Sequence, residues 1–182
     1  ERGTNNLTLL YIGNLGSGHD LSGFKKWIAA KKEKIRIATV GTAKEGQRRF
    51  QNLTNQKDTL SHRHWGRLAD EQLKRKVTQG NVHFGLVFMD PSWTGLISPS
   101  KFSTYMGLPL PLLYFGPSGT NADKICREFG GGLAFEDPSG ASATPCPRPG
   151  SEAHDKLLEG VVRAKEYFDS YDARRFVEEV LG

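Results

Sequence analysis

The chain has 182 residues, of which 37% are hydrophobic and 25% charged, and this length suits one α/β domain with a buried core. No apolar run approaches the length that crosses a bilayer, which excludes a membrane-spanning helix on sequence grounds. The net charge is +5, and the lysines and arginines stand mostly beside acids in predicted helices. Solvated helix faces are therefore favoured over a nucleic-acid surface, with attraction to anionic lipid headgroups as a lesser alternative.

Strands and helices alternate along the chain. The predicted elements are a strand at 7–12, a helix at 22–34, a strand at 35–41, a helix at 44–53, a strand at 59–65, a helix at 71–78 that Asp70 caps or opens, a strand at 82–89, a short helix starting at Ser98, a strand at 111–116, a helix at 121–129, a strand at 132–136, and helices at 151–171 and 173–181. The alternation predicts an α/β, doubly wound, Rossmann-like fold: six parallel strands with helices on both faces. We assign residues 1–140 to that domain, 141–150 to a loop, and 151–182 to C-terminal helices that pack on the same domain.

Ligands of open α/β sheets bind at the carboxyl ends of the strands, which makes three loops candidates for a site. The first loop reads Gly-Asn-Leu-Gly-Ser-Gly-His-Asp over residues 13–20. Its glycines let the backbone approach a polar ligand, and its amides could meet a diphosphate, although a plain strand-to-helix turn accounts for the loop equally well. The candidates here are Gly13, Asn14, Gly16, Ser17, Gly18 and His19.

The second candidate loop is Trp65-Gly66-Arg67, after the third strand. An indole and a guanidinium beside a glycine could receive a base by stacking, through Trp65 and Arg67, although the apolar bulk of Trp65 favours a place in the core.

The third candidate is the helix start Ser98-Pro99-Ser100-Lys101. Ser98 can cap the helix, and Pro99 suits its first turn. Free N–H groups, the hydroxyls of Ser98 and Ser100, and the Lys101 ammonium together favour a phosphate-binding site over an ordinary capped helix.

The remaining reactive side chains do not form a recognisable centre in the sequence. His62, His64 and His83 alternate with other residues in predicted strands and lack partners at metal-ligand spacing, so we expect no metal. Cys126 and Cys146 are too few for a disulfide scaffold, which favours a reducing compartment.

Read in order, several segments resemble the C-terminal half of GT-B glycosyltransferases, and within them the large retaining family of bacterial polysaccharide and lipopolysaccharide transferases. The resemblance spans about Leu7 to Asp137. The segments that carry it are Leu9 to Gly16, Trp65 to Leu68 with Glu71 to Leu73, Val82 to Met89, Ser98 to Phe102 with Tyr105-Met106 and a following proline, and Gly130 to Leu133. Each motif is degenerate, and the ordered set is what resembles the family.

The resemblance implies a nucleotide-sugar donor-binding domain, with a nucleoside-diphosphate sugar as substrate and no cofactor or metal. It places the loop 13–18 at the cleft between two domains, Trp65 to Arg67 near the base, and Ser98 to Lys101 near the ribose and phosphates. A separate N-terminal domain would bind the glycan or lipid-linked acceptor, and the chain begins at Glu1 without Met, as expected of a piece of a longer protein. We expect a cytoplasmic protein without nucleic-acid partners, with peripheral association at the cytoplasmic membrane face as an option for the full-length protein.

The sequence also departs from the family. Many members carry two glutamates with seven residues between them, the second touching the donor ribose, and aligned on Tyr105-Met106 these positions are Leu96 and Thr104 here. The family's usual basic pair after the first strand is replaced by Asn14 and the region of His19. Two alternatives to a transferase therefore stay open: a GT-B-like binding or assembly module without turnover, and a sugar-nucleotide epimerase of the same layout.

Overall fold

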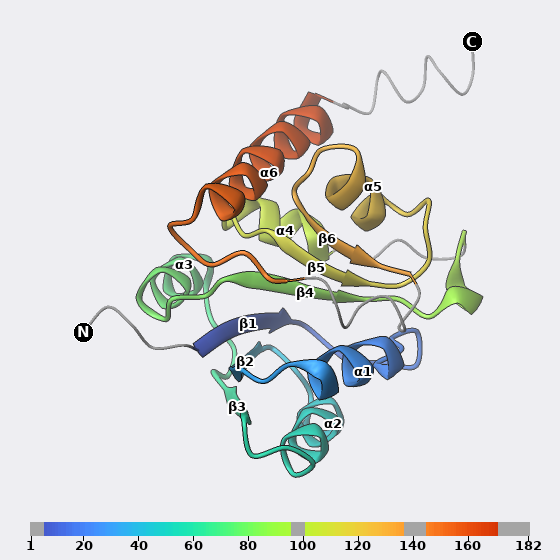
Figure 1. The fold of residues 1–182 in the computed structure, drawn as a ribbon, viewed down its shortest axis with the longest axis vertical. Helices are drawn as coiled ribbons and strands as arrows, with labels where there is room; N and C mark the ends of the chain where they lie inside the picture. Colours follow the sequence, from blue (N-terminus) through green and yellow to red (C-terminus); the bar gives the residue numbers. More distant parts are fainter. Residues whose placement is uncertain (1–5, 96–100, 137–144, 171–182) are drawn as a thin grey trace.

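The computed structural model describes residues 6–95, 101–136 and 145–170 (Figure 1). It contains a six-stranded parallel sheet in the order β3-β2-β1-β4-β5-β6. The strands are β1 (Asn6–Ile12), β2 (Lys34–Val40), β3 (Leu60–His64), β4 (Phe84–Phe88), β5 (Leu112–Phe115) and β6 (Gly132–Phe135). All six strands that the sequence predicts are confirmed, as is the doubly wound, Rossmann-like architecture.

Helices cover both faces of the sheet (Figure 1). They are α1 (Ser22–Ala30), α2 (Lys44–Thr54), α3 (Asp70–Gln79), α4 (Lys101–Gly107), α5 (Asn121–Arg127) and α6 (Glu152–Ser170). Helices α1 and α2 bury residues such as Phe24 and Phe50 against one face, and α3 to α6 bury residues such as Leu73, Tyr105 and Val161 against the other. Each helix does so because its apolar residues recur at helical spacing and form one stripe toward the sheet.

Several element ends differ from the sequence prediction. The first helix ends at Ala30, four residues early, because Lys31 has extended backbone angles. Asp70 opens α3 as its first residue, while Ala69 holds the cap position. A 3-10 turn that the sequence did not reveal, η1 (Pro91–Trp93), follows β4, and its N-cap is Asp90, whose side chain accepts a hydrogen bond from the Ser92 N–H at 2.9 Å. The start of the short helix at Ser98 and the helix at 173–181 lie outside the described residues.

The junction between β1 and β4 is the least regular in the sheet. Strands β1 and β2 pair over seven residues, whereas β1 and β4 pair only at Leu9 with Phe84 and Leu10 with Gly85. Side chains extend this junction at both ends. At the amino end, the Thr8 N–H donates to Nδ1 of the His83 imidazole at 3.0 Å, and the carboxyl end is held by Tyr105.

Tyr105 reaches this junction because Gly85 has no side chain. A Cβ at Gly85 would lie 2.5 Å from the Tyr105 ring, so the ring occupies the space that any larger residue would fill. The Tyr105 hydroxyl accepts from the Ile12 N–H at 3.0 Å and lies 3.0 Å from the Leu10 carbonyl oxygen and 3.1 Å from the Leu86 carbonyl oxygen. One phenol thus takes the place of ladder bonds where the two strands diverge.

Candidate functional site

The carboxyl ends of β1 and β4 define the candidate site. The strand order reverses between them, because β2 and β3 lie on one side of β1 while β4, β5 and β6 lie on the other. Connections therefore leave these two neighbouring strands toward opposite faces, and the region between their carboxyl ends, the β1–β4 crevice, is where open α/β sheets bind ligands. The paired register ends at Leu10 and Gly85, so the last residues of the two strands are not joined by ladder pairs.

The glycine-rich loop begins at this crevice. Gly13 adopts φ +86°, a left-handed conformation that favours glycine, and its N–H donates to the Val40 carbonyl at 2.8 Å. The Thr42 hydroxyl donates to the Gly13 carbonyl at 2.9 Å, and the Asn14 side-chain oxygen accepts from the Ala43 N–H at 3.0 Å. The ends of β1 and β2 therefore hold the first turn of the loop in place.

Arg49 on α2 holds the rest of the loop. Its guanidinium donates to the Gly16 carbonyl at 3.3 Å and to the His19 carbonyl at 3.1 Å. Gly18 lies beside the segment that follows β4, since its carbonyl accepts a hydrogen bond from the Asp90 N–H at 3.0 Å. The sequence analysis interpreted Arg49 only as part of a solvated helix face, because no pattern in the sequence connects it to a loop thirty residues earlier.

Lys101, the first described residue of α4, lies over this loop. Its ammonium is 2.9 Å from Nε2 of His19 and 5.4 Å from the centre of the Tyr11 ring. Its Cε would touch a Cβ at Gly13 at 3.4 Å, so the missing side chain of Gly13 leaves room for the lysine. The sequence predicted Gly13 and His19 in one loop and Lys101 in a separate segment as site residues, and the structure brings all three together.

The charge state of His19 follows from this contact. An ammonium only donates, so Nε2 of His19 accepts from Lys101, while Nδ1 lies 3.1 Å from the Gly16 nitrogen and 3.3 Å from the Gly16 carbonyl oxygen. Burial and then the Lys101 charge lower the pKa of His19 to about 4, so the imidazole is neutral at pH 7. Burial also lowers the pKa of Lys101. The site thus holds a half-buried cation with a neutral partner, which leaves a positive charge for a ligand to neutralise.

The other predicted site residues have varied positions. Ser17 is exposed in the loop, and Thr104 is exposed on α4 one turn after Lys101. Ser98 and Ser100 lie outside the described residues. Trp65 lies at the end of β3 with its ring toward α3, 5.7 Å from the Lys76 ammonium, and belongs partly to the core, as its apolar bulk favoured. Arg67 is exposed.

The three histidines that the sequence analysis assigned to strands lie in a strand or directly before one. His62 and His64 lie in β3 and both contact the buried Thr39 hydroxyl, at 2.9 and 3.0 Å. His83 stands one residue before β4 and is buried. Within the described ranges, no three His, Cys, Asp or Glu side chains gather in a way that could hold a metal ion. The expectation of a metal-free site stays a prediction.

No protein-family model matches the chain, and no curated protein sequence matches it. Among solved structures, it is similar to HepE of Anabaena in complex with UDP-glucose, with a TM-score of 0.61 and 12% identity over 97% of this chain and 48% of HepE. It is also similar to a TarM variant of S. aureus in complex with fondaparinux, alpha-GlcNAc-glycerol and UDP, with a TM-score of 0.63 and 10% identity over 96% of this chain and 34% of TarM.

A third similar structure is the pneumococcal O-GlcNAc transferase GtfA in complex with UDP and GlcNAc, with a TM-score of 0.54 and 15% identity over 99% of this chain and 37% of GtfA. The chain spans about half the length of HepE and about a third of TarM and GtfA. Identities this low establish the fold alone. That fold is a GT-B glycosyltransferase-like, Rossmann-like fold, as the ordered motifs of the sequence predicted.

Proposed function

We propose that the chain is the nucleotide-sugar donor-binding domain of a glycosyltransferase that moves a sugar from a nucleoside-diphosphate sugar to a glycan or lipid-linked acceptor. The observation that carries this proposal is the position of Lys101 over the glycine-rich loop at the β1–β4 crevice, against Gly13 and His19. Fold neighbours solved with UDP-glucose or with UDP support the choice of donor.

In this proposal Lys101 binds the diphosphate. Its ammonium has no acid partner among the described residues, and its contact with a neutral imidazole is one that a phosphate oxygen can replace with a stronger, charge-assisted bond. In this proposal the loop 13–18 lies beside the same anion, and the open space where Gly16 lacks a side chain lets the diphosphate approach the backbone. When the sugar leaves, these groups stabilise the negative charge that develops on the diphosphate.

Transfer requires a second domain in this proposal. A GT-B site is completed by the acceptor-binding half, which orients the acceptor and excludes water. We propose that the chain by itself binds the donor weakly and transfers no sugar, and that the longer protein acts in polysaccharide biosynthesis in the cytoplasm. Among the described residues no helix is long and apolar enough to cross a membrane.

The test is calorimetric titration of the chain with UDP-glucose and with UDP. Replacing Lys101 by Ala removes one charge-assisted contact worth about 1.5–3 kcal/mol, so we expect affinity to fall roughly ten- to over a hundredfold. Lys156→Ala is the matched control, because it removes the same charge from the exposed face of α6, where Lys156 pairs with Glu152. Equal affinities of the Lys101→Ala and Lys156→Ala variants would overturn the assignment of the diphosphate site.

A second candidate is a binding or assembly module without turnover. Thr104 favours it, because the resemblance places a ribose-binding glutamate at this position and the structure exposes a threonine there, beside Lys101 on α4. The two candidates differ in one measurement. A transferase moves sugar from UDP-glucose or another donor once its acceptor-binding half is present, whereas a binding module takes up the donor and leaves it intact.

A further inference from the structure

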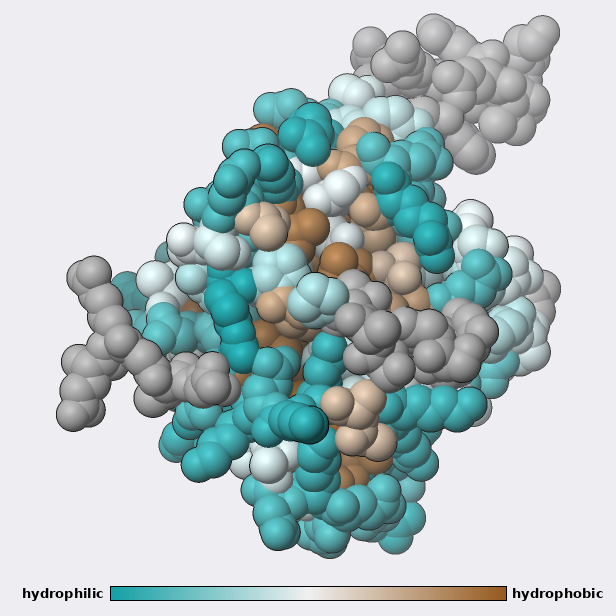
Figure 2. All heavy atoms as spheres, in the orientation of Figure 1, coloured by the Kyte–Doolittle hydropathy of each residue, from teal (hydrophilic) through white to brown (hydrophobic). Residues whose placement is uncertain are grey.

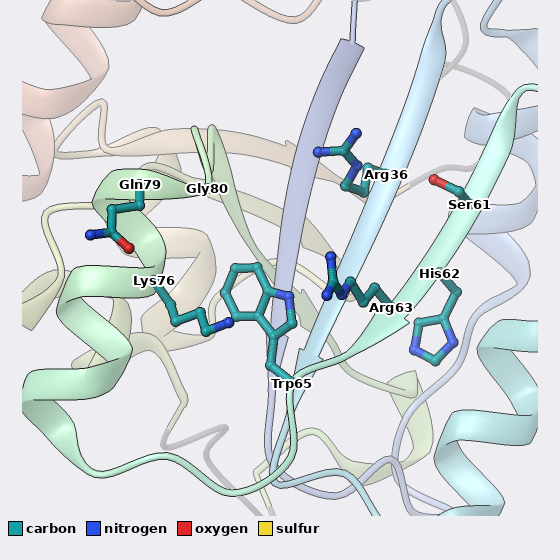
Figure 3. Close-up of a pocket in the computed structure, with 8 residues that line it drawn as sticks. All are labelled: Arg36, Ser61, His62, Arg63, Trp65, Lys76, Gln79 and Gly80. Atoms are coloured by element: carbon teal, nitrogen blue, oxygen red, sulfur yellow. The ribbon is translucent and has the colours of Figure 1, made fainter.

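A second cavity lies on the α3 face of the sheet, over β2 and β3 (Figure 3). Its volume is about 470 Å³. It exists because α3 covers only part of this face, and the residues that β2 and β3 direct to it are polar. Strand alternation places Arg36 and Ala38 of β2 on this face, and their register partners Ser61 and Arg63 of β3 beside them. The lining residues are Arg36, Ser61, His62, Arg63, Trp65, Lys76, Gln79 and Gly80.

Three of the lining side chains are cations, and none of the lining residues is acidic. Arg36 pairs in register with Ser61, so Arg63 is its diagonal neighbour on the next strand, within reach of a shared ligand. Lys76 approaches from α3 on the opposite wall (Figure 3). Like charges at such neighbouring positions repel one another, and an anion between them would relieve that repulsion.

Some cations elsewhere on the surface are paired with acids. Arg48, Lys74 and Lys156 each form an ion pair with a glutamate one helical turn away. Within the part of the chain that the structure describes, Arg36 and Arg63 have no such acid partner, and Lys76 contacts only the Trp65 ring. The positive charge of this cavity is therefore not neutralised by the described part of the protein.

Trp65 forms an aromatic wall of the cavity. Its indole stands between Lys76 and Arg63 in Figure 3, and it lies so close to Gly80 that a Cβ there would be 3.3 Å from the ring. The ring is partly exposed and faces the same space as the cations. His62 differs, because its ring stacks on Phe50 of α2, on the other face of the sheet.

The cavity lies apart from the donor crevice. Arg36 and Ser61 are early residues of their strands, and Gly80 follows α3 close to the amino end of β4. The lining residues thus extend to the amino half of the sheet, whereas Lys101 and the loop 13–18 lie at the carboxyl end.

The exposed surface offers little apolar area for docking. Among the described residues the only large hydrophobic side chains that are exposed are Val162 and Tyr167, both on α6, and most of the face in Figure 2 is hydrophilic.

We propose that this cavity binds a small ligand that carries a phosphate group next to a ring or an apolar group. Two guanidinium groups and an ammonium can donate to several oxygens of one phosphate, which carries more charge and more acceptor oxygens than a carboxylate. The indole of Trp65 supplies a flat surface for the attached group. A soluble phosphate ester and a phospholipid headgroup share this chemistry, and the experiment below distinguishes them.

The test follows amide and indole signals by nitrogen–proton NMR during titration with phenyl phosphate, which combines a phosphate and a ring. We expect the Trp65 indole and the amides of Ser61 and Gly80 to shift together. Arg63→Gln should weaken binding at least tenfold, and Lys76→Gln serves as a second variant if the first is poorly folded. Arg48→Gln, which removes an exposed arginine from α2, should leave affinity unchanged.

Further titrations identify whether the ligand is a soluble phosphate ester or a lipid headgroup, and whether the Trp65 ring recognises the group attached to the phosphate. Trp65→Leu should weaken phenyl phosphate more than inorganic phosphate, because only the former uses the ring. Arg63-dependent binding to phosphatidylglycerol vesicles stronger than to phenyl phosphate would assign the ligand as a lipid headgroup. The absence of shifts at Trp65, or equal affinities of the Arg63→Gln and Arg48→Gln variants, would overturn the proposal, as would binding of an RNA oligonucleotide without binding of phenyl phosphate.

The test of this cavity can be separated from the test of the proposed donor site. If both sites exist, Lys101→Ala keeps phenyl phosphate binding and Arg63→Gln keeps UDP-glucose binding. If UDP-glucose and phenyl phosphate compete for binding, and Arg63→Gln abolishes the binding of both, the two ligands share one site. That result would refute a separate phosphate site in the cavity.

Discussion

His83 makes the stability of the protein depend on pH between about 6.5 and 4. Its imidazole is buried at the amino end of the β1–β4 junction, where Nδ1 accepts from the Thr8 N–H. Burial, and after it the charges of His154 and Arg148, lower the pKa of His83 to about 4. In the unfolded chain the pKa of His83 is near 6.5, so below that pH His83 binds a proton in the unfolded chain more readily than in the folded one. The stability that depends on neutral His83 is therefore fully present above pH 6.5 and falls as the pH drops toward 4.

The size of this effect follows from the two pKa values. The difference between 6.5 and about 4 amounts to about 3 kcal/mol at pH 4, and about 1.4 kcal/mol at pH 5.5. Protonation of Nδ1 also removes the acceptor of the Thr8 N–H, which leaves a buried backbone donor without a partner.

The substitution that tests this is His83→Asn. The amide oxygen of asparagine can accept from the Thr8 N–H in place of Nδ1, but it does not titrate. Urea unfolding of both proteins at pH 7, 5.5 and 4 gives the difference in free energy of unfolding at each pH, in which the titrations of His19, His62 and the carboxylates cancel. We expect the advantage of the unmodified protein at pH 7 to shrink by about 3 kcal/mol at pH 4. Curves that stay parallel over this range would refute the reasoning.

Two further predictions concern α6 and the donor site. Gly160→Ala should lower the free energy of unfolding in urea by about 2 kcal/mol or more, because the new Cβ would lie 2.3 Å from the Gly130 carbonyl. This clash outweighs the preference of alanine for a helix, which is about 1 kcal/mol. Gly107→Ala is the control and should change stability little, because no atom of the described neighbours lies within 4 Å of the new Cβ. UDP-glucose binding should take up protons at pH 5.5, because an anion beside Lys101 raises the pKa of His19 from about 4, and affinity should rise as the pH falls. Calorimetry in buffers of different ionisation enthalpy measures the uptake, and the same uptake in His19→Asn would contradict this assignment.

The strands and the doubly wound fold class were accessible from the sequence because the signal of each strand is local. Runs such as Leu7 to Ile12 and Phe84 to Phe88 are mostly apolar, as expected of strands covered on both faces, and they alternate with amphipathic helices. The topology then places the ends of these strands at one edge, which is why the loop at Gly13 and Lys101 were identified as candidates for the same site before their contact was known.

Other features of the site depend on contacts that no local pattern encodes. Arg49 holds a loop thirty residues earlier, and Tyr105 reaches between two strands only because Gly85 is opposite its ring. The cavity at Arg36 and Arg63 was not predicted, because it needs the register of β2 against β3. Their charges look like ordinary surface residues until that register places them side by side.

The short paired register of β1 with β4 separates two blocks of three strands in the sheet. Along the shared edge the described residues join the two blocks through two register positions, a bond from the His83 N–H to the Thr8 carbonyl at 2.9 Å, and the side chains of His83 and Tyr105. Opening of such a boundary breaks fewer bonds than unfolding either block, so amide hydrogen exchange should first reveal it at Thr8 and Ile12, whose N–H groups face the β4 side. A nucleotide across the crevice would touch both blocks at once, and its binding energy would then add to the cohesion between them.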